Sequence, residues 1–140
     1  MNKIRVITDF GYDLVISGFQ NELIQSFINL INNAKDAIIE KVENPKDRLI
    51  LICTKKIESG LRLEIKDSGG GIDEEIINRI FEPYFTTKHK SQGTGIGLYM
   101  VLEIVKKHMN GEISVKNQEY IFKDKKYKGA EFTISLALKQ

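Results

Sequence analysis

The pattern of apolar and polar residues predicts that the first third of the chain holds short strands followed by one long helix. Lys3–Ile7 and Leu14–Ile16 have the composition of strands. From about Asn21, apolar residues recur at steps of three and four until Asn44 and Pro45, which is the period of an amphipathic helix. The helix is expected to end there because a residue before proline avoids helical backbone angles.

The middle of the chain is predicted to hold two strands and a short helix. Leu49–Thr54 is an apolar run of strand length, and its cysteine, Cys53, is expected to be a small core residue. Leu61–Lys66 alternates strictly between apolar and polar residues, which is the pattern of a half-buried strand. Glu74–Ile80 has the composition of a short helix, and Asp73 before it is a residue type that favours helix starts.

The last third is predicted to hold one helix and two strands. The helix is expected to begin after the glycines of residues 93–97 and to continue through Met109. Strands are expected at Glu112–Asn117 and Ala130–Leu138, with Glu119–Lys128 as a lysine-rich hairpin between them. No repeat or linker interrupts the pattern, so residues 1–140 are expected to form one domain.

Length and composition are those of an ordinary globular domain. The chain has 140 residues, of which 41% are hydrophobic and 29% charged. Its apolar runs are far shorter than the roughly 20 residues of a membrane-spanning helix, and the first residues lack the apolar core of a signal peptide. The net charge of +2 is too small to indicate nucleic-acid binding. We therefore expect a cytoplasmic chain without nucleic-acid or direct membrane contact.

A stripe of short polar residues follows one side of the long helix, since residues three and four apart share a helix face. Asparagine and aspartate favour helices poorly, so their repeated placement there requires a reason. Two explanations remain open, namely a solvent-facing patch or core amide network, and a set of oxygen ligands for a hard cation such as Mg²⁺. The stripe comprises Glu22, Ser26, Asn29, Asn33, Asp36 and Glu40.

The sequence DSGGGI, residues 67–72, places one carboxylate and three glycines at the end of the strand Leu61–Lys66. Ligand pockets of α/β sheets commonly form at the carboxyl ends of strands. Glycines accept left-handed backbone angles and let another molecule approach the main chain closely. An ordinary turn also explains an aspartate followed by glycines, so this stretch alone leaves both explanations open.

Residues 81–97 have the composition of a lid. The segment begins with aromatic residues, including Phe81 and Phe85, and then becomes charged, so one end would be held and the other could move. It runs into GTGIG at residues 93–97, where the exposed N–H groups and dipole of a helix start favour phosphate. The GxGxG pattern is weak alone, and its position counts against a dinucleotide-binding fold. The sequence has no GxxxxGK[ST] motif for a P-loop.

Taken together in order, these stretches resemble the ATP-binding catalytic domain of sensor histidine kinases, in a wider group shared with gyrase, a heat-shock chaperone and the MutL mismatch-repair protein. NLINNAKDAI is similar to the N box of that family, DSGGGI to its first glycine box, FEPYFTTK to its F box, GTGIGLYM to its second glycine box and GAEFTISLAL to its closing strand. The resemblance covers nearly the whole chain. It implies a two-layer α/β (α+β) sandwich of the Bergerat type, with a mixed, mostly antiparallel sheet, helices on one face and a mobile ATP lid at about residues 81–97.

The resemblance also implies roles for individual residues. Asn33 would bind the Mg²⁺ that bridges the ATP phosphates, with Asn29 beside it, and Asp67 would accept a hydrogen bond from the adenine amino group. The glycines of the first glycine box would shape the adenine pocket, and those of the second would close the lid onto the phosphates. Lys88 could add a phosphate contact or remain a solvated lysine. The expected ATP-binding residues are Asn29, Asn33, Asp67, Gly69, Gly71, Ile72, Phe81, Phe85, Lys88, Gly93, Thr94, Gly95, Ile96, Gly97, Leu98 and Thr133.

One position bears on which branch of the family the chain resembles, and another departs from the pattern of the family. In the gyrase and MutL branches a glutamate one turn before the magnesium asparagine activates water, and this chain has Asn29 there. An amide cannot act as a general base, which favours phosphoryl transfer to a protein over ATP hydrolysis. In the closing strand, Ala130 follows Gly129 where members often carry Gly-Thr, so one hydroxyl-mediated contact with adenine would be missing.

The favoured interpretation is a sensor histidine kinase domain in a two-component system, and two alternatives remain. One is a stand-alone serine kinase of the anti-sigma-factor type that regulates by sequestering a partner, and the other is an interaction domain without nucleotide. FEPYFTTK and NLINNAKDAI favour the sensor kinase, and the intact Asn33 and Asp67 disfavour the nucleotide-free domain.

Neither histidine of the chain stands in a phosphoacceptor motif. His89 and His108 both lack the HE sequence and following apolar residue that such motifs usually carry. We therefore expect the acceptor histidine on a separate dimerising helical hairpin of the parent kinase, with a response regulator downstream. The chain alone should bind ATP and turn over little, whether the parent is soluble or carries this chain at the cytoplasmic end of a membrane-anchored sensor.

Overall fold

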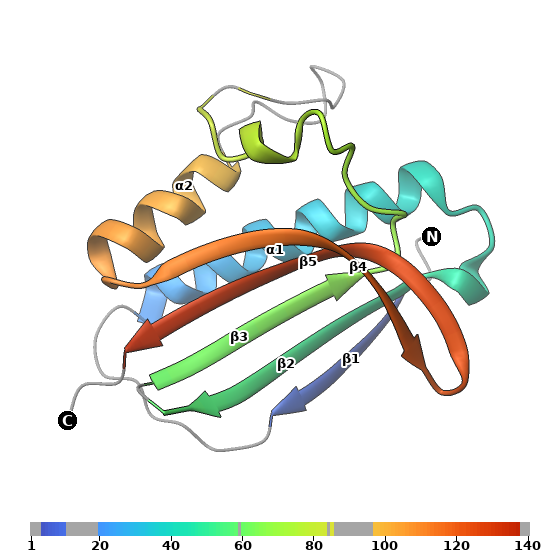
Figure 1. Cartoon of the computed structure of the whole chain (residues 1–140), viewed down its shortest axis with the longest axis horizontal. Coiled ribbons are helices and arrows are strands. Elements are labelled where there is room, and N and C mark those ends of the chain that lie inside the picture. Colours follow the sequence, from blue (N-terminus) through green and yellow to red (C-terminus); the bar gives the residue numbers. More distant parts are fainter. Residues whose placement is uncertain (1–3, 11–19, 59, 84, 86–96, 138–140) are drawn as a thin grey trace.

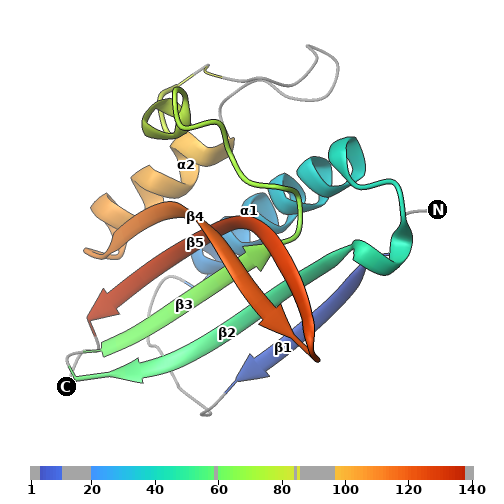
Figure 2. The same cartoon turned by 45° about the vertical axis from the view of Figure 1, so that its right-hand side comes forward.

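The computed structural model describes residues 4–10, 20–58, 60–83, 85 and 97–137. The predicted strand Leu14–Ile16 and most of the predicted lid lie outside these ranges. The described residues form a two-layer sandwich in which a mixed sheet carries helices on one of its faces (Figures 1 and 2). None of the described helices has the length and apolar character that crossing a membrane requires.

The sheet of the described residues has five strands in the order β1-β2-β3-β5-β4. β1 runs parallel to β2, and the other neighbouring pairs are antiparallel. A parallel pair needs a long crossover connection, and the first helix lies between these two strands in the sequence. The sheet confirms the predicted fold class. The strands are β1 (Arg5–Phe10), β2 (Leu49–Ile57), β3 (Gly60–Asp67), β4 (Glu112–Phe122) and β5 (Lys125–Ala137).

Two helices cover one face of this sheet (Figure 1). The helix α1 (Gln20–Lys41) has the predicted extent, and α2 (Gly97–Glu103) continues into the π-helical turn η3 (Ile104–His108). The predicted helix through Met109 is therefore present, with a wider last turn. Two short 3₁₀ turns, η1 (Pro45–Asp47) and η2 (Ile77–Arg79), lie in the connections.

The main core lies between α1, α2 and the inner face of the sheet. In α1, Leu30, Ala34 and Ile38 recur every four residues and are at most 2% exposed. The strands contribute every second residue, as expected where one face of a sheet is buried. These strand residues are Ile50 and Ile52 in β2, Leu61, Leu63 and Ile65 in β3, and Ala130, Phe132, Ile134 and Leu136 in β5.

The hairpin of β4 and β5 shields part of the outer face of the sheet. Its far end bends away from the helices (Figures 1 and 2), and Tyr120 and Tyr127 stack there with ring centroids 5.7 Å apart. Together with Leu49 they form a second, smaller apolar cluster. The predicted lysine-rich hairpin is thus continuous with both strands, and it turns at Lys123 and Asp124, which both have positive φ.

Two local predictions were wrong. Residues Glu74–Ile80 form turns and the short η2 instead of an α-helix. Asp73 does act as a cap, because its side chain accepts a hydrogen bond of 2.9 Å from the N–H of Glu75, but seven residues nucleate a helix poorly. Cys53, expected in the core, is half-buried and opposite Glu64 on the outer face of the sheet.

Candidate functional site

The site is built around Asp67, the last residue of β3, which is 4% exposed. Its Oδ1 accepts hydrogen bonds from the backbone N–H groups of Gly69 (2.9 Å) and Ala130 (3.1 Å). These two bonds fix the orientation of the carboxyl group. Burial raises the pKa of Asp67, against the lowering effects of both N–H groups and of the nearby Lys41. A buried, oriented carboxyl of this kind can recognise a hydrogen-bond donor on a ligand.

Two glycines let the chain pass close to Asp67 and to α1. A Cβ at Gly129 would lie 1.9 Å from the Asp67 carbonyl oxygen and 2.4 Å from its Oδ1. A Cβ at Gly69 would lie 3.0 Å from the Cβ of Ala37 in α1. Both contacts are closer than real Cβ atoms normally allow, so only glycine fits without movement. Gly129 was not among the predicted site residues, although it belongs to the closing-strand motif.

The rest of the glycine loop turns away from β3 through left-handed backbone angles. Gly70 and Gly71 have φ of 88° and 97°. The N–H of Gly70 donates a 3.0 Å hydrogen bond to the carbonyl oxygen of Lys128, which ties the loop to β5. Ile72 then packs against the main core. Gly69, Gly71 and Ile72, which the sequence assigned to the site, therefore follow Asp67 in one loop that is tied to β5 and packed against the main core.

The predicted asparagine pair lies on α1 as the helical period requires. Asn29 and Asn33 are half-buried, and Asn33 Nδ2 donates a 3.1 Å hydrogen bond to the Asn29 carbonyl oxygen. This bond commits the amide nitrogen of Asn33 to the helix backbone. Gly97 begins α2 nearby, since a Cβ built on it would lie 4.0 Å from Asn29 Oδ1. The N box and the end of the second glycine box thus meet at Asn29.

The described start of the predicted lid is anchored by aromatic rings. Phe81 meets Phe132 edge to face, with ring centroids 6.1 Å apart at 89°. The Arg79 guanidinium lies 4.6 Å from the centroid of the Phe85 ring. Leu98, at the beginning of α2, packs with both phenylalanines against the main core. The other predicted lid residues, Lys88, Gly93, Thr94, Gly95 and Ile96, lie outside the described residues.

Thr133 is not brought together with the other predicted residues. Ala130, whose N–H binds Asp67, lies three residues earlier on β5. Thr133 pairs with Glu64, and its neighbours Phe132 and Ile134 both face the helices. Because side chains alternate along a strand, Thr133 lies on the outer face of the sheet, away from the Asp67 carboxyl.

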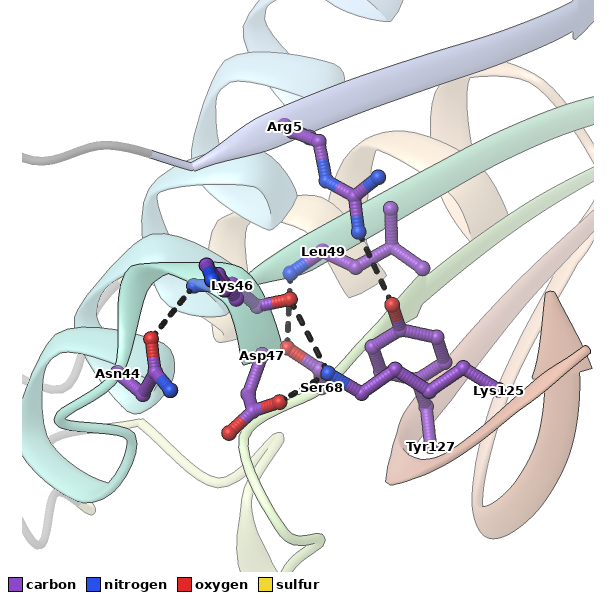
Figure 3. A network of polar contacts seen from close by, with 8 residues as sticks. All are labelled: Arg5, Asn44, Lys46, Asp47, Leu49, Ser68, Lys125 and Tyr127. Atoms are coloured by element: carbon purple, nitrogen blue, oxygen red, sulfur yellow. Dashed lines mark hydrogen bonds and ion pairs between the residues drawn. The ribbon is translucent and has the colours of Figure 1, made fainter. Parts of the chain in front are cut away.

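Polar contacts on the outer face of the sheet hold the backbone at the end of β3, next to Asp67. The Tyr120 hydroxyl donates a 2.7 Å hydrogen bond to the Asp67 carbonyl oxygen, and Ser68 Oγ accepts a 2.8 Å bond from the N–H of Leu49. Arg5 donates to the hydroxyl of Tyr127 at 3.0 Å (Figure 3). The sequence did not indicate these contacts, because they join residues that are far apart in the chain.

The same network fixes the far end of the hairpin. Lys125 forms an ion pair with Asp47 in η1 and also approaches the Lys46 carbonyl oxygen, and Asn44 caps this turn through the N–H of Lys46 (Figure 3). At the other side of the molecule, His108 at the end of η3 pairs with Glu22 at the start of α1, in keeping with a structural role for this histidine.

Comparison with known families identifies the family of the chain. The model of the histidine kinase-, DNA gyrase B- and HSP90-like ATPase family matches residues 18–140. The chain belongs to this family. The match includes all the motifs from which the resemblance was inferred, from the asparagine pair to the closing strand.

Members of the family named as kinases are similar over most of the chain. Sporulation kinase A of Bacillus subtilis is 36% identical over 140 residues, which cover 99% of the chain and 20% of that protein. The sensor histidine kinase ZraS of Escherichia coli K12 is 36% identical over 116 residues, covering 83% of the chain and 22% of that protein. The chain therefore spans about a fifth of the length of these relatives.

Solved structures of the family share the fold. The catalytic domain of the histidine kinase ThkA, in a nucleotide-free form, superposes with a TM-score of 0.76 and 27% identity. The alignment covers 97% of this chain and 80% of that domain. The full-length ShkA structure with AMPPNP, at 23% identity and a TM-score of 0.72, supports the fold alone, over 97% of this chain and 26% of that one.

Proposed function

We propose that this chain is the catalytic domain of a sensor histidine kinase, which binds Mg-ATP and donates the γ-phosphoryl group to a histidine on a separate dimerisation domain. The observation that carries the proposal is the buried Asp67 carboxyl, held by two backbone N–H groups beside a loop of glycines. Family membership, and relatives named as sensor and sporulation kinases, support it.

Asp67 would recognise the adenine base. One of its oxygens is committed to the N–H groups of Gly69 and Ala130, so the carboxyl is rigid before a ligand arrives. The adenine amino group is a donor, and guanine has a carbonyl acceptor at the equivalent position. A buried acceptor that meets another acceptor loses its hydrogen bond, which disfavours GTP. Gly69, Gly71 and Ile72 would contact the plane of the base.

Asn33, with Asn29 beside it, would hold the metal end of the nucleotide. Amide oxygens suit Mg²⁺, which keeps several waters and shares phosphate oxygens with its substrate. In the described part of the chain, His, Cys, Asp and Glu side chains do not gather in groups of three that could bind a metal, so a site completed by phosphates fits this donor set. Bound Mg²⁺ would neutralise developing charge on the phosphates.

The residues of the lid would complete the phosphate site. Gly97 and Leu98 begin α2 beside Asn29. The glycines at 93 and 95, with Thr94 and Ile96, would bring backbone N–H groups to the phosphates, and Lys88 would add a charge-assisted contact. Phe81 and Phe85 would anchor the first part of this lid against the core.

Phosphoryl transfer would then depend on a partner domain. The bond between the γ-phosphorus and the β–γ bridging oxygen breaks, ADP leaves, and a nitrogen of the acceptor imidazole forms the new bond to phosphorus. The proton displaced from the imidazole passes to a base on the partner domain. Asn29 stands where a water-activating glutamate would be needed, and its amide cannot take a proton from water. A response regulator would receive the phosphoryl group next, on the cytoplasmic side of any membrane anchor.

The test uses the full-length protein that contains this chain, incubated with γ-labelled ATP and Mg²⁺. We expect label that is lost in acid and stable in alkali, as phosphohistidine is. Acid-stable label on serine would instead support the serine kinase alternative. Similarity to the kinases named above does not favour that alternative. Release of free phosphate equal to the ATP consumed, without labelled protein, would contradict the proposal.

A further inference from the structure

Asn117 of β4 makes an unusual set of contacts with the glycine loop. Its Oδ1 accepts a 2.7 Å hydrogen bond from the N–H of Ile72, and its Nδ2 donates a 2.7 Å bond to the carbonyl oxygen of the same residue. Nδ2 also donates to Glu74 Oε1 at 2.9 Å. One side chain thus pairs with both backbone groups of Ile72, as a neighbouring strand would.

The position of Asn117 along β4 is that of an apolar residue. Ile113 and Val115, at steps of two before it, both pack against the main core, so Asn117 faces the helix-covered side of the sheet. A half-buried amide in this row requires partners for its donor and acceptor groups. The backbone of the glycine loop supplies them, across 45 positions of sequence.

Lys41 holds the same loop from the opposite side. It is the last residue of α1, and its Nζ donates a 3.0 Å hydrogen bond to the carbonyl oxygen of Gly71. Gly71 has a φ of 97°, and a Cβ there would lie 2.8 Å from Asn117 Oδ1. The turn is therefore confined between a helix end and a strand, although it contains no regular structure of its own.

We propose that Lys41 and Asn117, together called the loop clamp, are positioning residues for nucleotide binding. The inference rests on the proposed function, since it concerns the glycine loop that would contact the base. A glycine-rich loop has many accessible conformations, and a ligand that must order it loses affinity. The loop clamp orders Gly71 and Ile72 before the ligand arrives, so affinity depends on side chains that need not touch the nucleotide.

The experiment compares Asn117→Ala and Lys41→Met with the unmodified chain in titrations with AMPPNP and with adenosine. Ser114→Ala is the matched control, because Ser114 is an exposed residue of the same strand on the opposite face. We expect Asn117→Ala to bind both ligands about tenfold more weakly, or about 1.4 kcal/mol. Lys41→Met should cost about threefold for both, since its hydrogen bond is exposed.

Two further readouts separate positioning from a general loss of structure. The melting temperature of the nucleotide-free Lys41→Met variant should be unchanged, because Lys41 is exposed. Amide hydrogen exchange at Ile72 should become faster in Asn117→Ala without nucleotide, since Asn117 supplies the acceptor for that N–H. If Lys41→Met loses affinity equally for adenosine and for AMPPNP, the charge of Lys41 does not act through the phosphates.

The outcomes that oppose the inference differ from those that oppose the proposed function. Unmodified chain that binds neither ligand would overturn the proposed function and the inference with it. Unmodified chain that binds, with Lys41→Met and Asn117→Ala binding equally well, would overturn the loop clamp alone. If Asn117→Ala does not fold, the exposed Lys41→Met decides, and its unchanged affinity for adenosine would refute the inference.

Discussion

Replacing Asp67 by asparagine tests the recognition of the base with almost no change in side-chain shape. In Asp67→Asn the amide oxygen can keep the two hydrogen bonds from Gly69 and Ala130, at 2.9 and 3.1 Å. The second carboxylate oxygen then becomes an NH₂ group. An acceptor for the adenine amino group is thereby replaced by a donor, and the two donors oppose each other.

The expected loss of affinity follows from that mismatch. Leaving a buried hydrogen-bonding group without its partner costs about 1–3 kcal/mol, which is about 5- to 150-fold in the dissociation constant.

The free energy of unfolding should not fall with the affinity. Asp67 is 4% exposed, and its charge is destabilised by burial, whereas an amide carries no charge that must leave water. At pH 7 the free energy of unfolding of Asp67→Asn should therefore equal or exceed that of the unmodified chain.

The pH dependence gives a second check on the same substitution. Because burial raises the pKa of Asp67 above its ordinary 3.8, the folded state holds this proton more tightly than the unfolded state. The stability that the protonated carboxyl provides is present below about pH 3.8 and is lost as pH rises through the raised pKa. Relative to Asp67→Asn, the unmodified chain should lose stability over that window.

Calorimetric titration with AMPPNP and urea unfolding at several pH values measure the two effects. Weaker nucleotide binding with unchanged or greater stability at pH 7 would support the role given to Asp67. Equal affinity in both proteins would refute base recognition by Asp67. A large loss of stability at pH 7 would show that the charged carboxyl itself is needed by the fold.

Three other substitutions give further tests. Asn33→Ala should remove most of the Mg²⁺ dependence of AMPPNP binding, and a retained dependence would exclude Asn33 as a ligand. Tyr120→Phe removes the buried 2.7 Å hydrogen bond to the Asp67 carbonyl oxygen and should lower the free energy of unfolding by about 1–3 kcal/mol, measured by urea unfolding. Gly129→Ala places a Cβ against Asp67 and should cost about 1–3 kcal/mol of stability and weaken AMPPNP binding, whereas unaltered binding would mean that the loop can shift freely.

The features that sequence predicted well are those with a local cause. The extent of α1 followed from its three-and-four period and from Pro45, and the period also placed Asn29 and Asn33 on one side of it. The alternation in residues 61–66 predicted β3, which put Asp67 at a strand end. The family motifs suggested roles for residues that periodicity alone left open, and those roles stay predictions.

The features that sequence missed depend on contacts between distant segments. Nothing near Asn117 shows that its amide pairs with Ile72, although an asparagine in the apolar row of a strand was an available signal. Tyr120 reaches Asp67 only because the hairpin bends. Thr133 was assigned from its motif without regard to strand alternation, which puts it on the outer face.

The measurement that tests the central claim most directly is a calorimetric titration of the purified chain with AMPPNP, with and without Mg²⁺, and with GTP as the competing nucleotide. Saturable binding that prefers the adenine nucleotide and strengthens with Mg²⁺ is the predicted result. Binding of GTP with equal affinity would contradict recognition by Asp67. Absence of any nucleotide binding by the folded chain would contradict the proposed function.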